Sequence, residues 1–333
     1  MTYPVPRPHH PARMLCPPSE KALHMSSQPF SSVQHSEQIG REVDEIGDVP
    51  SEVGPLPGDP RERPAGGSAH RLAATELFDA HLHVIDPRFP LVASEGYVPE
   101  PFTVADYRAR TAGLEGAGPG PATVTDHGAR TSGLAITGGA VVAGSFQGFD
   151  QRWLLDALAR LGPGFVGVAQ LAPDVADAEV LALHAAGVRA VRFNVHRGGS
   201  LEAGLARRVH ALAGWHAEVY ADGAALAALE PALAALPRLS VDHLGLTADA
   251  LPVLLRLVAG GARVKATGFG RLALDVAATL RAVAAADPAA LLWGSDLPGT
   301  RARRPFAPED LELVRAAGGD RALGENARAW YAP

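Results

Sequence analysis

The sequence is poor in cysteine, in basic charge and in long apolar runs. Its 333 residues include one cysteine, Cys16, so neither an intrachain disulfide nor a cysteine-based zinc site can form. Arg, Asp, Pro or Gly breaks every apolar run well before the ~18 residues that a membrane span needs. The net charge of −6 argues against a nucleic-acid-binding or anionic-membrane-binding surface. These features predict a soluble, cytoplasmic protein that binds neither nucleic acid nor membrane.

The first 76 residues differ in composition from the rest. They hold 12 of the 28 prolines but only two of the 19 aromatic residues, so they cannot bury enough apolar surface to offset the entropy lost on ordering. We therefore predict a disordered Pro/Ser-rich tail at 1–76 and a folded domain at 77–333. A Gly/Pro/Thr-rich stretch at 115–132 is predicted to be a flexible insertion loop.

From residue 77 onward, short β-like runs alternate with Ala/Leu/Arg-rich amphipathic stretches. This alternation indicates βαβ units and a parallel sheet. Eight runs in 257 residues predict an α/β fold of the (β/α)₈ TIM-barrel type. A doubly wound sheet is the alternative, but no Gly-rich dinucleotide fingerprint follows the first run. The predicted strands are 77–84, 140–146, 165–171, 188–195, 216–222, 239–243, 263–268 and 291–296.

Alternation within the first run indicates which side chains face the barrel interior. Asp79, His81 and His83 fall on one face, and the apolar side chains, Phe78 among them, fall on the other. Since the apolar face should meet the helices, both histidines are predicted to point inward. Two imidazoles at i and i+2 can converge on one point, as metal ligands do.

Two further polar groups stand at strand tips. His243 ends the sixth run, on the same face as Leu239 and Val241, and Asp296 ends the last run. Side chains at the carboxyl ends of barrel strands gather at one mouth, where barrel enzymes carry their active sites. Together with His81 and His83, these groups predict a catalytic centre, because core packing alone does not account for four polar groups at strand tips.

Four short motifs stand at the predicted strand ends. They are Asp-Ala-His-Leu-His at 79–83, Val-Arg-Phe-Asn at 191–194, Asp-His-Leu-Gly at 242–245 and Trp-Gly-Ser-Asp-Leu-Pro at 293–298. In their order along the chain, they resemble those of the amidohydrolase-related family of TIM-barrel hydrolases, and most closely the branch that contains 2-pyrone-4,6-dicarboxylate lactonase.

The resemblance implies catalytic roles for His81, His83, His243 and Asp296. In metal-dependent relatives, residues matching His81, His83 and Asp296 bind a divalent ion together with a histidine at the tip of strand five, where this chain has Tyr220 or Asp222. The resemblance thus favours a metal-free site, with one zinc or manganese ion on His81, His83 and Asp296 as the alternative. A binuclear site is disfavoured, since the fourth strand offers Asn194 instead of a bridging lysine or glutamate.

Arginines are the expected substrate-binding groups, because a guanidinium engages two carboxylate oxygens at once. Arg192 and Arg271 fall where the lactonase branch uses arginines on its dicarboxylate, and Arg197 is one position away from a third such arginine. Tyr97 resembles a substrate-contacting tyrosine in the loop after strand one. With 28 arginines against two lysines, a single arginine is weak evidence, and Arg192 could instead neutralise a carboxylate inside the barrel, either Asp79 or Glu218.

Two other basic groups are given structural roles. Lys265 is predicted to be an ion-pair partner, and the arginine-rich run at 301–304 is predicted to be a solvated loop that could touch a carboxylate substrate.

These features predict a hydrolase of a small carboxylated lactone or ester, with Asp296 activating water. One alternative is a metal-dependent decarboxylase of a carboxylated unsaturated acid, and another is a barrel that binds a small acid without turning it over. A small carboxylated molecule is the one partner that we expect. The sequence does not define the substrate or the oligomeric state.

Overall fold

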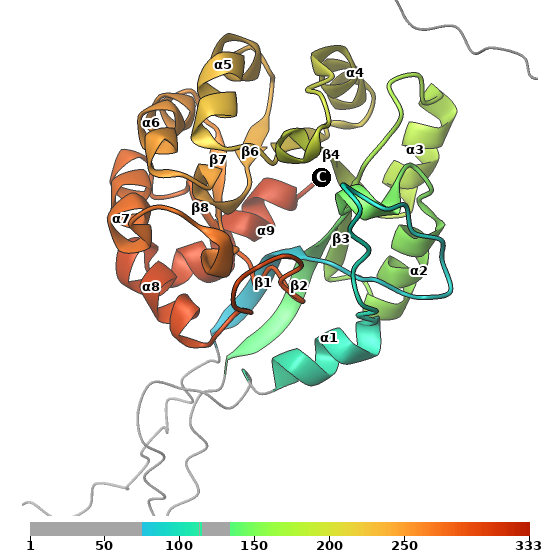
Figure 1. Cartoon of the computed structure of the whole chain (residues 1–333), viewed down its shortest axis with the longest axis horizontal. Helices are drawn as coiled ribbons and strands as arrows, with labels where there is room; N and C mark the ends of the chain where they lie inside the picture. The colour runs from blue at the N-terminus through green and yellow to red at the C-terminus, as the bar shows by residue number, and fades with distance from the viewer. Residues whose placement is uncertain (1–74, 113, 115–133) are drawn as a thin grey trace, which may run out of the picture. The chain divides into compact units, whose positions relative to one another are not determined.

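The computed structural model describes residues 75–112, 114 and 134–333, which form a parallel sheet of eight strands surrounded by helices (Figure 1). Each strand pairs with the next along the chain, in the order β1 to β8, so the predicted TIM barrel is confirmed. The strands are β1 Glu76–Leu82, β2 Ala135–Val142, β3 Phe165–Ala169, β4 Val188–Phe193, β5 His216–Val219, β6 Leu239–Val241, β7 Arg263–Ala266 and β8 Leu291–Trp293.

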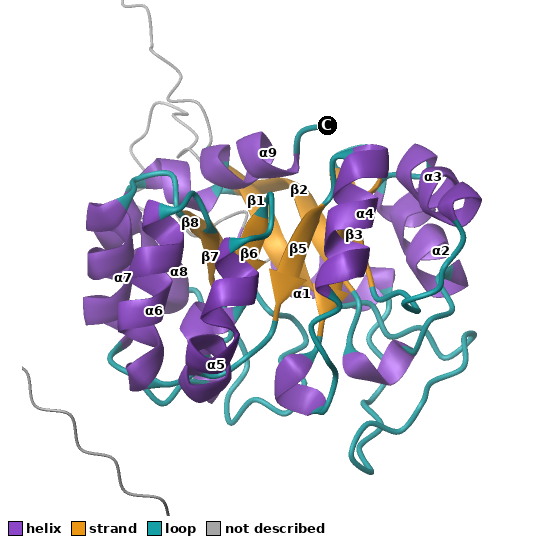
Figure 2. Ribbon diagram, turned by 90° about the horizontal axis from the view of Figure 1, so that it is seen from above, coloured by secondary structure: helices purple, strands orange, loops and turns teal. Residues whose placement is uncertain are grey.

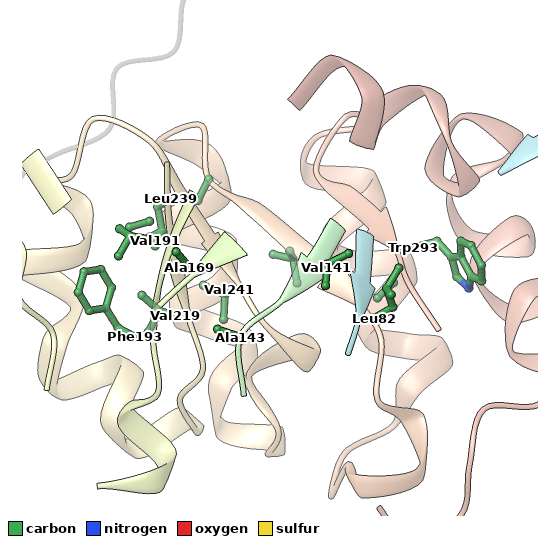
Figure 3. Packing of buried hydrophobic residues seen from close by; sticks show 14 of the residues in the cluster. Leu82, Val141, Ala143, Ala169, Val191, Phe193, Val219, Leu239, Val241 and Trp293 are labelled. Carbon is green, nitrogen blue, oxygen red and sulfur yellow. The ribbon is translucent and has the colours of Figure 1, made fainter. Parts of the chain in front are cut away.

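The helices form an outer ring around the sheet (Figure 1), and a cluster of buried apolar side chains lies between the two, part of which Figure 3 shows. In this layer, buried strand residues such as Val191 and Val241 meet helix residues such as Leu154 and Leu254. None of the helices in the described ranges combines the length and the hydropathy that a membrane crossing requires. The helices are α1 Val104–Thr111, α2 Arg152–Leu161, α3 Asp177–Ala185, α4 Ala203–Ala213, α5 Gly223–Ala234, α6 Leu251–Ala259, α7 Val276–Ala286, α8 Glu309–Gly318 and α9 Glu325–Tyr331.

The predicted tail and insertion loop lie outside the described residues, except for the last two tail residues, 75 and 76, of which Glu76 is the first residue of β1. Strand β2 begins five residues before its predicted start, in a segment that contains Gly138 and Gly139. Glycine is depleted in strands, which hid this segment from a pattern-based prediction. Here it allows close approach: a Cβ atom on Gly138 would lie 2.3 Å from the carbonyl oxygen of Gly164.

The alternation predicted for β1 is wrong at its first residues. Phe78 points into the barrel, where its ring stacks on Tyr331 with the centroids 5.5 Å apart, and Asp79 turns towards helix α1. The pairing of β1 with β2 is irregular between Leu77 and Phe78 and again between Asp79 and Leu82. Both histidines point inward as predicted, His81 within the second irregularity and His83 after it. A β-bulge of this kind exchanges the two faces of a strand.

The carboxylate of Asp79 holds the seam between β1 and β8. It accepts hydrogen bonds from the backbone N–H of Ser295 (2.8 Å), from the hydroxyl of Ser295 (2.6 Å) and from the hydroxyl of Tyr107 (3.0 Å). Two backbone hydrogen bonds join the same two chain segments, from Asp296 N to His81 O (2.7 Å) and from His83 N to Leu297 O (2.8 Å). Asp79 thus fixes the main chain next to two of the predicted site residues.

Helix α9 closes the amino-terminal end of the barrel, opposite the long loops (Figure 2). The rings of Trp330 and Tyr331 both lie 5.0 Å from the ring of His216, the first residue of β5. The hydroxyl of Tyr331 donates to Glu218 Oε1 at 2.5 Å. The carboxyl-terminal end of the barrel is therefore the end that is left open for a site.

Removing the Asp79 carboxylate should destabilise the fold strongly. Asp79→Ala leaves the buried Ser295 N–H, the Ser295 hydroxyl and the Tyr107 hydroxyl without their acceptor, and we expect a loss of about 3–5 kcal/mol in the free energy of unfolding. Tyr107→Phe removes one donor only and should cost about 1 kcal/mol. Urea unfolding of both variants measures the difference, and equal losses would argue against a role for Asp79 at the seam.

Candidate active site at the carboxyl-terminal mouth

Three imidazoles converge on one carboxylate oxygen at the open mouth. The Nε2 atoms of His81, His83 and His243 lie 3.8, 3.7 and 3.9 Å from Oδ1 of Asp296. All four side chains are buried. The structure therefore brings together the four residues that the sequence singled out, although they come from three different strand ends.

Two of the four residues have a left-handed backbone. His243 follows β6 with φ of 51°, and Asp296 follows β8 with φ of 57°. Leu239 and Val241 face the helices, so regular alternation would have turned His243 away from the mouth, and the shared face that we predicted for these three residues is wrong. The left-handed turn directs His243 back into the mouth. Strained residues of this kind occur at functional sites, where the surroundings enforce them.

Hydrogen bonds orient the three rings. His83 donates from Nδ1 to the carbonyl oxygen of Val142 at 2.8 Å, which leaves a lone pair on its Nε2. His243 Nδ1 lies 2.6 Å from the Thr267 hydroxyl oxygen. His81 Nδ1 lies 3.4 Å from both Lys265 Nζ and Asp242 Oδ1. Among the described residues, neither His81 Nε2 nor Asp296 Oδ1 has a hydrogen-bond partner.

The protonation states follow from burial and from the neighbouring charges. Burial by itself would raise the pKa of Asp296, but the guanidinium of Arg271, which donates to Oδ2, holds it well below its ordinary value. Burial lowers the pKa of His243 to about 3 and also lowers the pKa of His81. At neutral pH the site thus contains an ionised carboxylate next to two neutral imidazoles.

The same donor set fits a single divalent ion. The ligand atoms of His81, His83 and Asp296 lie within 4.8 Å of one another, and so do those of His81, Asp242 and His243. A zinc or manganese ion binds neutral imidazoles and ionised carboxylates, and this site supplies both. Two of the ligand atoms, His81 Nε2 and Asp296 Oδ1, have no hydrogen-bond partner among the described residues and so could bind the ion.

Below the site, buried charges are paired along the barrel interior. Asp242 accepts from Arg192 Nε at 2.9 Å and lies 3.6 Å from Lys265 Nζ, which is 2.5 Å from Glu218 Oε2. Arg192 thus neutralises Asp242, and neither Asp79 nor Glu218 as the sequence suggested. Lys265 has the structural ion-pair role that we predicted for it.

A cavity with about 340 Å³ of empty space, its open mouth included, is lined by His83 and His243 but not by His81 or Asp296. A second cavity of about 930 Å³ adjoins it and shares the side chains of Ser145, Arg192, Asn194 and Arg197. Four arginines line the first cavity, and no aspartate or glutamate does. Its lining is His83, Gly144, Ser145, Phe146, Arg192, Asn194, Arg197, Tyr220, His243, Arg271, Thr300 and Arg301.

The predicted substrate-binding residues divide into two groups. Arg192, Arg197 and Arg271 line the cavity. Tyr97 does not line it, and its ring lies instead 4.5 Å from the guanidinium of Arg301. Arg301 was assigned to a solvated loop, yet it lines the cavity with only 18% of its side chain exposed.

Sequence reasoning missed two further cavity residues. Tyr220 was considered only as the replacement for a metal ligand, but its ring lies 5.2 Å from the His243 ring and 5.1 Å from the Arg192 guanidinium. Ser145 follows β2, whose end was predicted too late. Asp222, by contrast, caps helix α5 by accepting from Ala225 N and is not part of the cavity.

A polar centre at the carboxyl-terminal mouth of a (β/α)₈ barrel defines a barrel enzyme.

The family follows from comparison with known proteins. The model of the amidohydrolase family matches residues 78–332, and the chain belongs to this family. It is 30% identical over 178 residues to a 2-pyrone-4,6-dicarboxylate hydrolase of Comamonas testosteroni, which covers 50% of this chain and 51% of that protein. It is 27% identical over 264 residues to a 4-sulfomuconolactone hydrolase of Rhizobium radiobacter, which covers 71% of this chain and 81% of that protein. The chain thus spans about half the length of the first of these relatives.

Solved structures share the fold. A protein from Agrobacterium tumefaciens superposes with a TM-score of 0.65 at 22% identity, covering 78% of this chain and 97% of its own. A probable 2-pyrone-4,6-dicarboxylic acid hydrolase from Acinetobacter baumannii, with citric acid bound, gives a TM-score of 0.61 at 21% identity, covering 77% of this chain and 98% of its own. At these identities, the likeness concerns the barrel alone.

The buried histidines should make stability depend on pH. Because the pKa of His243 is about 3 in the folded protein and 6.5 for a free histidine, the unfolded chain takes up a proton first as the pH falls. His243 therefore lowers the free energy of unfolding below pH 6.5, by up to about 1.4 kcal/mol per pH unit. We expect His243→Asn to flatten the loss of stability between pH 7 and pH 5, as measured by urea unfolding. The matched control is His196→Asn, a half-exposed histidine outside the site, and an equal pH dependence in all three proteins would contradict the prediction.

Proposed function

We propose that the chain hydrolyses a small lactone or ester that carries carboxylate groups, with Asp296 as the base that activates water. The observation that supports this most strongly is an ionised, buried carboxylate, with one unpartnered oxygen among the described residues, that pairs with Arg271, one of the four arginines that line the cavity. A cavity so rich in guanidinium groups favours a substrate with several negative charges. Both named relatives are hydrolases of acidic lactone-type compounds.

Asp296 has one oxygen free for the proton transfer. Arg271 holds Oδ2, so Oδ1 can accept a proton from a water molecule as the water oxygen attacks the ester carbonyl. A carboxylate of very low pKa is a weak base. A substrate carboxylate that engages Arg271 weakens its pairing with Asp296 and thereby raises the pKa of Asp296 once the substrate is bound. The acid group of the substrate would then serve both as an anchor and as an activator of the base.

The histidines can stabilise the negative charge that forms on the carbonyl oxygen. The ammonium group of Lys265 has only protons to donate, so its contact with His81 Nδ1 places the proton of the neutral imidazole on Nε2, which faces Asp296. If the Thr267 hydroxyl donates to His243 Nδ1, His243 likewise presents an Nε2 proton. Two N–H donors of this kind can act as an oxyanion hole.

We favour the metal-free form of this site, because two cations lie next to the donor set. Lys265 contacts His81, and Arg271 pairs with Asp296, and both positive charges oppose a bound divalent ion. In the alternative form, His81, His83 and Asp296 would hold a zinc or manganese ion, which when bound supplies a Lewis acid and an acidified water. His81 would then carry its proton on Nδ1, towards Asp242.

Replacing the proposed base should abolish turnover without weakening substrate binding. We expect Asp296→Asn to lower kcat at least about 100-fold without raising KM, because the arginines still anchor the substrate. The assay is a panel of pyrone, lactone and muconate-type carboxylates. Asp174→Asn, an exposed aspartate in the loop after β3, is the matched control and should keep wild-type kcat. Wild-type turnover by Asp296→Asn on every substrate would rule out Asp296 as the base.

Metal analysis separates the two forms of the site. We expect protein from medium supplemented with zinc and manganese to contain far less than one ion per chain, and its hydrolytic activity to survive dialysis against a chelator. A stoichiometric ion that activity requires, and that His83→Ala loses, would establish the metal-dependent form instead.

A further inference from the structure

A tight hairpin places an acidic side chain at the rim of the cavity. In the loop between β1 and α1, Ser94 and Tyr97 exchange two backbone hydrogen bonds of 3.0 and 2.9 Å. The two residues between them, Glu95 and Gly96, have φ of 50° and 74°, as in a type I′ turn. Glycine or asparagine is the usual residue at such positions, so a glutamate here is uncommon.

The Glu95 carboxylate bridges two of the four cavity arginines. Its Oε2 accepts from Arg301 Nη1 at 2.8 Å and from Arg197 Nη1 at 3.3 Å. Arg197 follows β4 and Arg301 follows β8, so the contact spans the mouth between strands far apart in the barrel. Arg301 also donates to the Ser94 carbonyl oxygen, and its guanidinium lies over the Tyr97 ring.

The other two cavity arginines are paired differently. Arg192 and Arg271 each have a carboxylate partner that is buried in the barrel, Asp242 and Asp296 respectively. Arg197 and Arg301 share a single carboxylate, whose side chain is 53% exposed. Among the described residues, Glu95 is the one carboxylate that pairs with these two guanidinium groups, so the cluster has a net positive charge. A carboxylate that stays half exposed gives up little solvation and is exchanged for another more readily than a buried one.

We propose that Arg197 and Arg301 form a second anion-binding subsite, and that Glu95 occupies this subsite until an acid group of the substrate displaces it. The proposal rests on the proposed function, since the same cavity holds the substrate, and it adds a competitor that belongs to the protein itself. The ligand class is an acid with a carboxylate or sulfonate remote from the ester bond. A ligand with one acid group that binds at Arg192 or Arg271 leaves Glu95 in place, so the subsite selects for ligands with at least two acid groups.

A purely structural role for Glu95 makes the opposite prediction. If Glu95 serves to hold Arg197 and Arg301 in position for the ligand, its removal weakens ligand binding. If Glu95 competes with the ligand, its removal strengthens binding. The direction of the change therefore separates the two roles.

Citrate binding to the full-length protein tests the proposal without any turnover. Calorimetry at about 0.15 M ionic strength compares the wild type with Glu95→Gln, which keeps the shape of the side chain and removes its charge. We expect Glu95→Gln to bind citrate about three- to tenfold more tightly. Glu100→Gln, an exposed glutamate in the same loop for which the described residues show no ion pair, makes the same change in net charge and should alter affinity less than twofold.

Arg301→Gln completes the test. It should weaken citrate binding, and in its presence the gain from Glu95→Gln should shrink, because the two substitutions act on one subsite. Unchanged or weaker binding by Glu95→Gln would overturn the inference, and so would a lack of citrate binding in every variant. If the wild type hydrolyses esters but Glu95→Gln binds citrate with the same affinity as the wild type, only this inference fails. If citrate binding responds as expected while no ester is hydrolysed, the subsite stands and the proposed reaction fails.

Discussion

The ion pair between Arg271 and Asp296 is the interaction on which the chemistry of this barrel depends. A carboxylate taken out of water would normally be protonated, because burial disfavours its charge. The guanidinium on Oδ2 reverses this preference and leaves Oδ1 ionised and free among three imidazoles. The same contact would limit the strength of Asp296 as the base that we propose, so the proposed reaction depends on what else engages Arg271.

The charges around this pair are arranged as a chain through the barrel interior. Asp242 contacts Arg192, Lys265 and His81. Lys265 also pairs with Glu218, which accepts a hydrogen bond from the Tyr331 hydroxyl of helix α9. Each buried charge thus has a partner of opposite sign, the condition under which charged groups are tolerated inside a protein. Along this chain, the floor of the barrel is linked to the ring of His81 at the mouth.

The sequence predicted the barrel from its periodicity and the four central residues from their places at the strand ends. Strands of parallel type alternate with helices, and side chains at the strand ends meet at one mouth. The alternation failed at Phe78 and Asp79, where a bulge intervenes, and at His243, where a left-handed backbone turns the side chain round. Such local departures have no periodic signature.

The rim of the site could not be predicted for a related reason. Arg301 lies in a loop with a left-handed φ of 60°, and Glu95 lies in a two-residue turn. Their meeting depends on the path of two loops that are 206 residues apart in the chain. The partner of Arg192 likewise depended on the register between β4 and β6, which alternation within a single strand does not define.

The contact between Asp79 and Ser295 spans 216 residues and so joins the first strand to the segment after the last one. An interaction so distant in sequence carries a large loop-closure entropy and contributes nothing until almost the whole domain has been assembled. During synthesis, the edge of β1 that faces β8 therefore stays unpaired until the eighth strand has left the ribosome. The contacts that join β1 to the segment after β8 also lie next to His81 and His83, so a chain that ends before β8 carries the His-x-His motif without the arrangement that we propose to be catalytic.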